Sequence, residues 1–258
     1  EAGRAYYERC VRILEEVDAL EGALREGRDE PRGTLTIAAP QTFGERFVSD
    51  AAAAFIGEYP QVEVELYFSD RYVNIVEEGI DLAIRIGELD DSRLVSRRLG
   101  EVHLIACASP DYLAARGTPR HPSDLVDHDC VRDRNFRRGT KWPFAKGEQR
   151  QDIDIRGRLI VNGIMACHRA TLAGAGIGLL AAYMVEDELS RGTLVRVLDD
   201  YQSSALPISA VYPHRQYLAA KVKTFVDFIA GRIGAHGLDG CGPRVKQPRG
   251  APGTRKPR

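Results

Sequence analysis

Three short segments, each at the end of a predicted strand, are the best candidates for binding chemistry in this sequence. They lie where an apolar run leads into a predicted helix, and their residues are Gln41, Thr42, Phe43, Ser69, Asn162 and Gly163. In parallel α/β sheets, ligands bind at the carboxyl ends of strands, where unpaired N–H groups and the positive end of a helix dipole attract an anion such as a carboxylate. Arg85, inside an otherwise apolar run, would supply a counter-charge. For Ser69 and Asn162 the alternative stays open that they only cap helices.

The sequence contains none of the patterns that accompany nucleophilic catalysis or metal binding. Gly-x-Ser-x-Gly and His-Glu-x-x-His are absent, and the six histidines are isolated. Among them, His168 lies on a predicted helix that would turn it toward a cleft. The five cysteines have no Cys-x-x-Cys spacing, and they are Cys10, Cys107, Cys130, Cys167 and Cys241. We therefore expect no metal, no cofactor, no disulfide framework, no enzymatic activity and a reduced, cytoplasmic setting.

Two further segments admit a ligand-binding interpretation beside a structural one. Glycines at 174, 176 and 178 follow a predicted helix and precede a strand, the reverse of the order that a dinucleotide site needs, so a helix cap is expected. Residues 132–146 interleave basic and aromatic side chains as a single-strand nucleic-acid surface does. A solvated loop with a packed Trp142 is the favoured alternative there.

Length, charge and hydropathy narrow the possible classes of protein. A chain of 258 residues holds one large domain or two small ones. The net charge of −1 does not indicate a strongly basic nucleic-acid binder. The longest nearly unbroken apolar run, 177–185, is half of what a membrane-spanning helix needs. The first thirty residues are too densely charged for a secretory signal, and the chain begins with Glu1 rather than Met, so a segment upstream is expected.

The N-terminal segment has the spacing of a coiled coil. Its apolar seam repeats at intervals of four and three residues, through Tyr6, Cys10, Ile13, Val17, Leu20 and Leu24. One interpretation is an amphipathic helix packed on its own domain. The other is a dimerising helix that stands away from the domain, and the charged linker at 25–33, with its Gly and Pro residues, favours it.

Between residues 33 and 236 the pattern alternates between strands and helices. Strands are predicted at 34–39, 62–68, 81–86, 102–108, 153–161, 193–198 and 207–212, with another after the glycines at 174–178. Helices are predicted at 43–59, 70–78 with Ser69 as N-cap, 110–116, 162–173 with Asn162 as N-cap, after 181 to Arg191, and 215–233. This alternation predicts βαβ units and a mainly parallel sheet. Residues 237–258, rich in Gly, Pro, Arg and Lys, predict a disordered basic tail, solvated or weakly bound to nucleic acid.

Several runs, taken in their order along the chain, resemble the LysR-type transcriptional regulator family. Residues 1–10 resemble its linker helix, and 69–87 with 91–94 and 98–99 resemble its most characteristic run. The later matches are 108–113, 117–119, 124–130, 173–180 and 192–195. Each run is weak alone, and their shared order makes the resemblance specific. The winged helix-turn-helix with which the family begins is absent from these residues.

The resemblance implies a periplasmic-binding-protein-like (type II) α/β domain of two lobes, preceded by a long linker helix. The implied boundaries are 1–32 for the linker and dimerisation helix, 33–107 plus 206–236 for lobe I, 108–205 for lobe II, and 237–258 for the disordered basic tail. The inducer pocket maps to Gln41, Thr42, Phe43, Ser69, Arg85, Asn162 and Gly163, with the loop at 133–136 closing it.

The implied partners are a small, often anionic metabolite and further copies of the chain, as a dimer or tetramer. Operator DNA would be reached only through the missing winged helix-turn-helix, and no membrane is involved. Two alternatives remain. A transporter's solute-binding protein would need an export signal and no heptad helix, and a small α/β enzyme would need a nucleophile or an acid–base pair.

Overall fold

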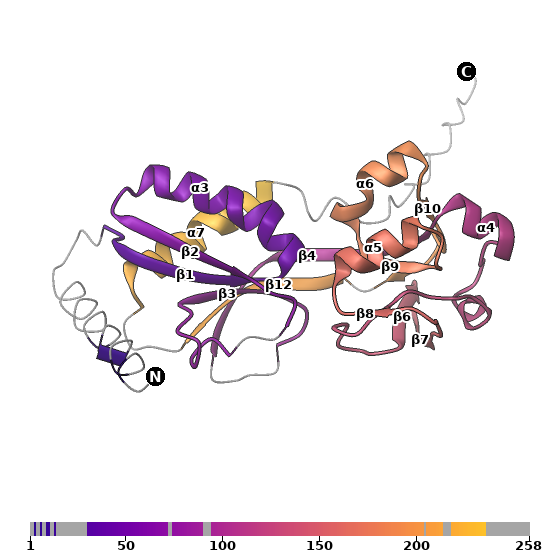
Figure 1. The fold of residues 1–258 in the computed structure, drawn as a ribbon, viewed down its shortest axis with the longest axis horizontal. Coiled ribbons are helices and arrows are strands. Elements are labelled where there is room, and N and C mark those ends of the chain that lie inside the picture. The colour runs from indigo at the N-terminus through magenta and orange to yellow at the C-terminus, as the bar shows by residue number, and fades with distance from the viewer. Residues whose placement is uncertain are drawn as a thin grey trace, which may run out of the picture.

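The computed structural model describes residues 30–71, 74–89, 94–203, 205–213 and 218–235, and before them Gly3, Tyr6, Arg9, Cys10 and Ile13. Within these residues the chain forms two α/β lobes side by side along the long axis of the molecule (Figure 1). Two long strands join the lobes, β4 (Leu94–Ala108) and β12 (Ala205–Pro213). None of the described helices is long and apolar enough to cross a membrane.

The sheet of the first lobe is mixed, which corrects the expectation of a mainly parallel sheet. Strand β1 (Gly33–Ala39) pairs in parallel with β2 (Val62–Phe68) and β3 (Leu82–Ile86). Strand β12 then pairs antiparallel with both β3 and β4. The reason is the crossover: β4 carries the chain into the second lobe, and β12 carries it back in the opposite direction.

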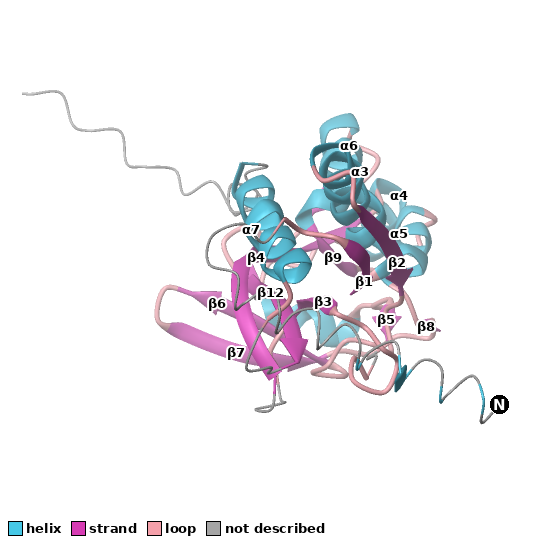
Figure 2. Cartoon of the chain, turned by 90° about the vertical axis from the view of Figure 1, so that its left-hand side faces the viewer, coloured by secondary structure: helices cyan, strands magenta, loops and turns pink. Residues whose placement is uncertain are grey.

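Helices of the first lobe cover one face of this sheet. The predicted helix 43–59 is observed as α2 (Gln41–Phe43), a π-helical turn (Gly44–Val48) and α3 (Ser49–Glu58) in unbroken succession. Helix α7 (Ala220–Ala235) lies on the same side as α3 (Figures 1 and 2). The two helices meet through the rings of Phe55 and Phe225, whose centroids are 5.0 Å apart and which are both fully buried. This aromatic contact anchors the core of the first lobe.

On the opposite face the described residues form a turn where a helix was expected. The prediction of a helix over 70–78 is wrong for its described part, because residues 75–79 form only a turn, and residues 72 and 73 lie outside the described residues. At the start of this turn, the side chain of Asn74 accepts a hydrogen bond from the N–H of Val76 at 3.3 Å, the role that was expected of Ser69. The turn ends at Gly79, which has a positive φ of 70°. The turn still buries Ile75 and Ile80 against the sheet.

The second lobe is built on the far end of β4. Residues 104–108 of β4 pair antiparallel with β9 (Gly178–Ala181) and β10 (Val195–Arg196). Helices α4 (Pro110–Arg116), α5 (Ile164–Leu172) and α6 (Ala182–Arg191) and a 3₁₀ helix (Pro122–Asp127) pack around them. The hairpin of β6 (Lys141–Lys146) and β7 (Gln149–Asp154) carries β11 (Gln202–Ser203) on its edge, and β5 (Arg132–Asp133) pairs with β8 (Ile160–Val161).

Two expectations for the second lobe are corrected. The predicted strand 153–161 breaks between β7 and β8, because the chain passes so close to Cys130 that a Cβ on Gly157 would lie 1.7 Å from its carbonyl oxygen. Helix α5 has Gly163 as its N-cap residue, with no side-chain cap, so Asn162 does not cap it.

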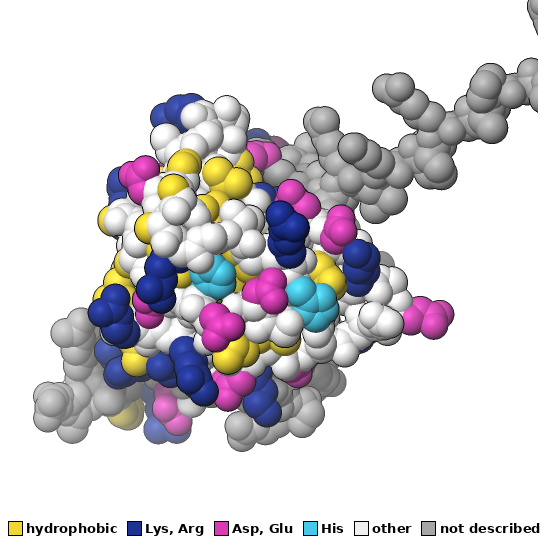
Figure 3. Space-filling model, turned by 90° about the vertical axis from the view of Figure 1, so that its right-hand side faces the viewer, with side chains coloured by type: hydrophobic (Ala, Val, Ile, Leu, Met, Phe, Trp, Pro, Cys, Tyr) yellow, Lys and Arg dark blue, Asp and Glu magenta, His cyan; other side chains and the backbone are white. Residues whose placement is uncertain are grey.

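Two of the three aromatic rings in the basic and aromatic segment 132–146 are buried. Trp142 and Phe144 are buried on β6, at 3% and 2% exposure. Figure 3 shows the end of the molecule formed by the second lobe, where basic and acidic side chains are interspersed. Buried rings cannot stack on bases, and the third ring, Phe136, is half-buried in a cavity wall. The single-strand interpretation therefore loses most of its aromatic component.

Of the N-terminal seam, Tyr6, Cys10 and Ile13 are helical, and Tyr6 and Ile13 are 74% and 58% exposed. Val17, Leu20 and Leu24 lie outside the described residues, as does the predicted tail at 237–258. The dimerisation helix and the disordered tail therefore stay predictions.

Candidate functional site

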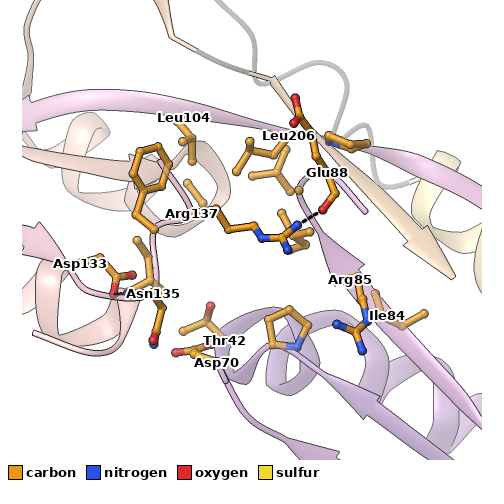
Figure 4. A pocket seen from close by; sticks show the side chains of 18 of the residues that line it. Thr42, Asp70, Ile84, Arg85, Glu88, Leu104, Asp133, Asn135, Arg137 and Leu206 are labelled. Atoms are coloured by element: carbon orange, nitrogen blue, oxygen red, sulfur yellow. Dashed lines mark hydrogen bonds between the residues drawn. The ribbon is translucent and has the colours of Figure 1, made fainter. Parts of the chain in front are cut away.

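A cavity of about 740 Å³ lies between the two lobes (Figure 4). The first lobe and the crossover strands contribute residues 38–40, 42, 69–71, 83–89, 102, 104 and 205–207 to its walls, and the second lobe contributes residues 131, 133, 135–138, 142, 164, 167, 179, 181 and 183. This volume suits a small-molecule site, in which a mainly apolar wall carries a few placed polar groups. Because both lobes form the wall, a ligand bound there would contact both.

Three of the seven predicted site residues line the cavity: Thr42, Ser69 and Arg85. Thr42 follows β1 and is buried, Ser69 directly follows β2, and Arg85 projects from β3. They meet because β1, β2 and β3 are parallel neighbours whose carboxyl ends share one edge of the sheet.

The other four predicted residues do not line the cavity, although they are neighbours of residues that do. Phe43 is fully buried and packs on Phe47, and the side chain of the exposed Gln41 donates to Glu45. Asn162 contributes its carbonyl oxygen, which accepts a hydrogen bond from the side chain of Asn135 at 2.8 Å. Gly163 begins α5. None of these four is among the residues that line the cavity.

A carboxylate of the protein itself occupies the helix N-terminus where a ligand's carboxylate was expected. The backbone N–H of Gln41 donates to Oδ1 of Asp70 at 3.0 Å. Asp70 also reaches toward the second lobe, since a Cβ on Gly163 would lie 3.3 Å from its Oδ2. Ser69 turns its hydroxyl to the N–H of Arg71, at 3.1 Å. An anionic ligand must therefore find its counter-charge elsewhere in the cavity.

A second carboxylate, that of Asp133, enters the wall from the second lobe. Its Oδ1 accepts the backbone N–H of Asn135 at 2.9 Å. Burial raises the pKa of Asp133, and the nearby charge of Asp70 raises it further, although the hydrogen bond from Asn135 acts in the opposite direction. Asp133 is therefore a partly desolvated carboxyl group on the same side of the cavity as the carboxylate of Asp70.

Guanidinium groups lie on the other side of the cavity. Figure 4 shows Arg85 and Arg137 on the side away from Asp70 and Asp133. Arg137, from the second lobe, donates through Nη1 to the carbonyl oxygen of Glu88 in the first lobe. Guanidinium groups bind carboxylates with directed hydrogen bonds, which gives this side the chemistry of an anion site.

Tyr183, another residue of the cavity wall, connects the lobes. Its hydroxyl is 3.1 Å from Oγ1 of Thr42, and its carbonyl oxygen accepts a hydrogen bond from Arg46. Burial is the main cause that raises the pKa of its phenol. Tyr183 was not predicted as a site residue, and no pattern in the sequence indicates it. Asp133 belongs to the loop at 133–136 that was expected to close the pocket, and Asp70 belongs to the predicted junction after β2, although neither carboxylate was predicted as a ligand contact.

The residues with reactive side chains offer little for catalysis. His168 is buried with its Nε2 3.3 Å from Oε1 of Glu188, and it is not among the cavity residues. Cys10, Cys107, Cys130 and Cys167 are free thiols. Burial raises the pKa of Cys107, Cys130 and Cys167 to about 12, so at neutral pH they are thiols rather than nucleophilic thiolates. In the described part of the chain, no group of three or more His, Cys, Asp and Glu residues is arranged to hold a metal ion.

Two α/β lobes, two crossover strands and a cavity between the lobes define a type II periplasmic-binding-protein-like fold. Residues 28–233 match the family model described as the LysR substrate binding domain. The chain belongs to this family, and it is the effector-binding domain of a LysR-type regulator.

Curated relatives and solved structures agree with this assignment. The transcriptional regulator PtxR of Pseudomonas aeruginosa is 34% identical over 223 residues, 86% of this chain and 72% of the relative. The regulator DmlR of Escherichia coli K12 is 34% identical over 238 residues, 92% and 77% of the two chains. Full-length AphB of Vibrio cholerae is 29% identical with a TM-score of 0.69, covering 90% of this chain and 79% of that one.

The regulatory domain of CrgA from Neisseria meningitidis, a LysR-type transcriptional regulator, matches with a TM-score of 0.68 at 29% identity, over 79% of this chain and all of that one. These relatives are transcriptional regulators, which favours that function over the transporter and enzyme alternatives.

Proposed function

We propose that this chain is the effector-sensing and oligomerising portion of its regulator, and that it binds a small anionic metabolite in the cavity between its lobes. The observation that carries the proposal is the cavity of about 740 Å³ whose wall comes from both lobes. We propose lobe I at 33–107 plus 206–236 and lobe II at 108–205, with residues 104–107 of β4, which pair with β9, as part of the crossover between them. Thr42, Ser69 and Arg85 are the proposed ligand contacts, and Gln41, Phe43, Asn162 and Gly163 support the wall.

The proposed mechanism is a shift between lobe arrangements. A ligand that contacts both lobes stabilises the arrangement in which both sets of contacts form. Two hydrogen-bonding contacts already join the lobes, one between Arg137 and Glu88 and one between Thr42 and Tyr183. Such a shift would break these contacts or form them again. No covalent step, metal or cofactor is involved, and the proposed setting is the cytoplasm.

Oligomerisation would transmit the shift to DNA. Tyr6 and Ile13 expose apolar side chains on a helix, which supports a partner helix from a second copy. We propose a dimer or tetramer held by residues 1–32. Its geometry would set how winged helix-turn-helix domains, outside these 258 residues, are presented to an operator.

A thermal-shift screen of small carboxylic acids tests the proposal, since a ligand that binds only the folded state raises the melting temperature. For the best acid, Thr42→Val should weaken affinity about five- to tenfold, because it removes one hydrogen-bonding group from the wall. Ser69→Ala should weaken it in the same direction. Thr36→Val, the same change in the middle of β1 and outside the cavity wall, is the matched control.

Sedimentation velocity of the same variants should show an unchanged oligomer. Two results would contradict the assignment of the cavity as the ligand site. In one, Thr42→Val loses both its ligand affinity and its oligomeric state; in the other, Thr42→Val and Thr36→Val bind the ligand equally well.

A further inference from the structure

Two groups of charged side chains in the cavity wall form poles, which we name by their charge. The acidic pole is Asp70 and Asp133, on one side with Asn135, and the basic pole is Arg85 and Arg137, on the other (Figure 4). The wall also contains Arg71, Glu88 and Arg138. Each pole draws on both lobes, because Asp70 and Arg85 belong to the first lobe and Asp133 and Arg137 to the second. The complementary ligand would therefore carry two opposite charges rather than one.

The acidic pole repels the anion that the helix N-termini were expected to attract. The N–H of Gln41 is already bonded to Asp70, and the Asp70 and Asp133 carboxylates are near enough to act on each other electrostatically. In a cavity that excludes part of the water, two neighbouring carboxylates repel more strongly than in bulk solvent. A carboxylate placed beside them would add a third negative charge, whereas an ammonium group would relieve the repulsion and donate hydrogen bonds.

The basic pole has the opposite preference. Arg85 projects from β3 at the centre of the first-lobe sheet, between β1 and β12. Arg137 reaches across to Glu88, which places a guanidinium group where the two lobes approach each other. A carboxylate at this pole would accept directed hydrogen bonds from guanidinium groups of both lobes.

We propose that the ligand of this cavity is a zwitterion, with its ammonium group at Asp70 and Asp133 and its carboxylate at Arg85 and Arg137. This inference rests on the proposed function of the cavity and narrows the class of metabolite that it takes. Each charged end of the ligand would touch both lobes, so either end would hold the lobes in one arrangement. Asp133 and Asp70 are then the residues that distinguish an amino acid from a simple carboxylic acid.

Matched probes test the proposal on the full chain at pH 7. The compounds of the first set share a benzene ring. In this set 4-(aminomethyl)benzoate is the zwitterion, 4-methylbenzoate carries only the negative charge, and 4-methylbenzylamine carries only the positive charge. A second set is 4-aminobutyrate, 5-aminopentanoate and 6-aminohexanoate, each paired with the straight-chain acid that lacks the amine. Thermal shift ranks the probes, and isothermal titration calorimetry gives the dissociation constants. We expect at least one zwitterion to bind tenfold or more tightly than its matched acid.

Variants then locate the preference. Asp133→Asn should weaken the best zwitterion at least tenfold and change the matched acid less than twofold, whereas Arg85→Gln should weaken both. Asp50→Asn, the same change at an exposed position on α3, is the control.

The possible failures are distinguishable. If acids bind as tightly as zwitterions and Arg85→Gln weakens them, the cavity is the site and the zwitterion proposal is wrong. The proposal also fails if Asp133→Asn weakens acid and zwitterion equally. If no probe binds, or if Arg85→Gln leaves binding unchanged, both this proposal and the proposed function of the cavity are contradicted.

Discussion

Asp133 shows how a single residue of the cavity couples binding chemistry to stability. Burial and the neighbouring Asp70 raise its pKa in the folded protein, so between the ordinary value and the raised value the folded state holds a proton that the unfolded chain releases. Stability therefore falls as the pH rises through this window. Above the raised pKa, the charged and partly desolvated carboxylate of Asp133 lowers the free energy of unfolding by its full amount. Below the ordinary pKa, the group is protonated in both states and has no such effect.

Asp133→Asn should accordingly stabilise the ligand-free protein at pH 7 and leave it unchanged at a pH below the ordinary value for Asp, because the amide carries no charge to desolvate. Urea unfolding across a pH series measures this difference. Asp50→Asn, the same change at an exposed site, is the control. A loss of stability at pH 7 in Asp133→Asn would show that the carboxylate is stabilised by its surroundings.

Three of the seven residues predicted from the sequence, Thr42, Ser69 and Arg85, line the cavity. They could be predicted because the apolar runs of β1, β2 and β3, and the residues in or just after them, are visible in the local sequence. Asp133 and Tyr183 lie far along the sequence from them, and they enter the wall only because two crossover strands bring the second lobe against the first. No spacing in the sequence encodes that approach.

Strands and helices could be predicted from the sequence where one face of the element is buried and the other is exposed to solvent. Strand β2 is correct to the residue because its apolar side chains alternate with polar ones. The segments 70–78 and 153–161 failed because tertiary contacts outweigh their local pattern. In the first, Ile75 and Ile80 are held against the sheet by a single turn, and in the second Gly157 is pressed against Cys130.

The break between β7 and β8 gives a test at this scale. In Gly157→Ala the new Cβ would lie 1.7 Å from the carbonyl oxygen of Cys130, and backbone must move to accept it. We expect a loss of at least about 1–3 kcal/mol in the free energy of unfolding, as for other overpacked sites. Gly231→Ala in α7 is the matched control, since its Cβ would meet no atom within 4 Å and should stabilise the helix by about 0.5–1 kcal/mol. Urea denaturation compares the two variants, and equal stabilities would contradict the close approach at Gly157.

At the scale of the whole molecule, the two lobes are joined by β4 and β12 and by side-chain contacts around the cavity. Arg46 and Thr42 bond to Tyr183, and Arg137 bonds to Glu88. The family relationship establishes an effector-binding domain, and this arrangement indicates how a ligand would act, by adding contacts to both lobes at once.

Hydrogen–deuterium exchange of the full chain, with and without the probe that gives the largest rise in melting temperature, tests this central claim most directly. Ligand contact with both walls should slow exchange in peptides that cover 82–89 of the first lobe and 131–138 of the second, while α4 at Pro110–Arg116, which lines no part of the cavity, stays unchanged. Protection confined to one lobe, or protection at surfaces away from the cavity alone, would contradict the account.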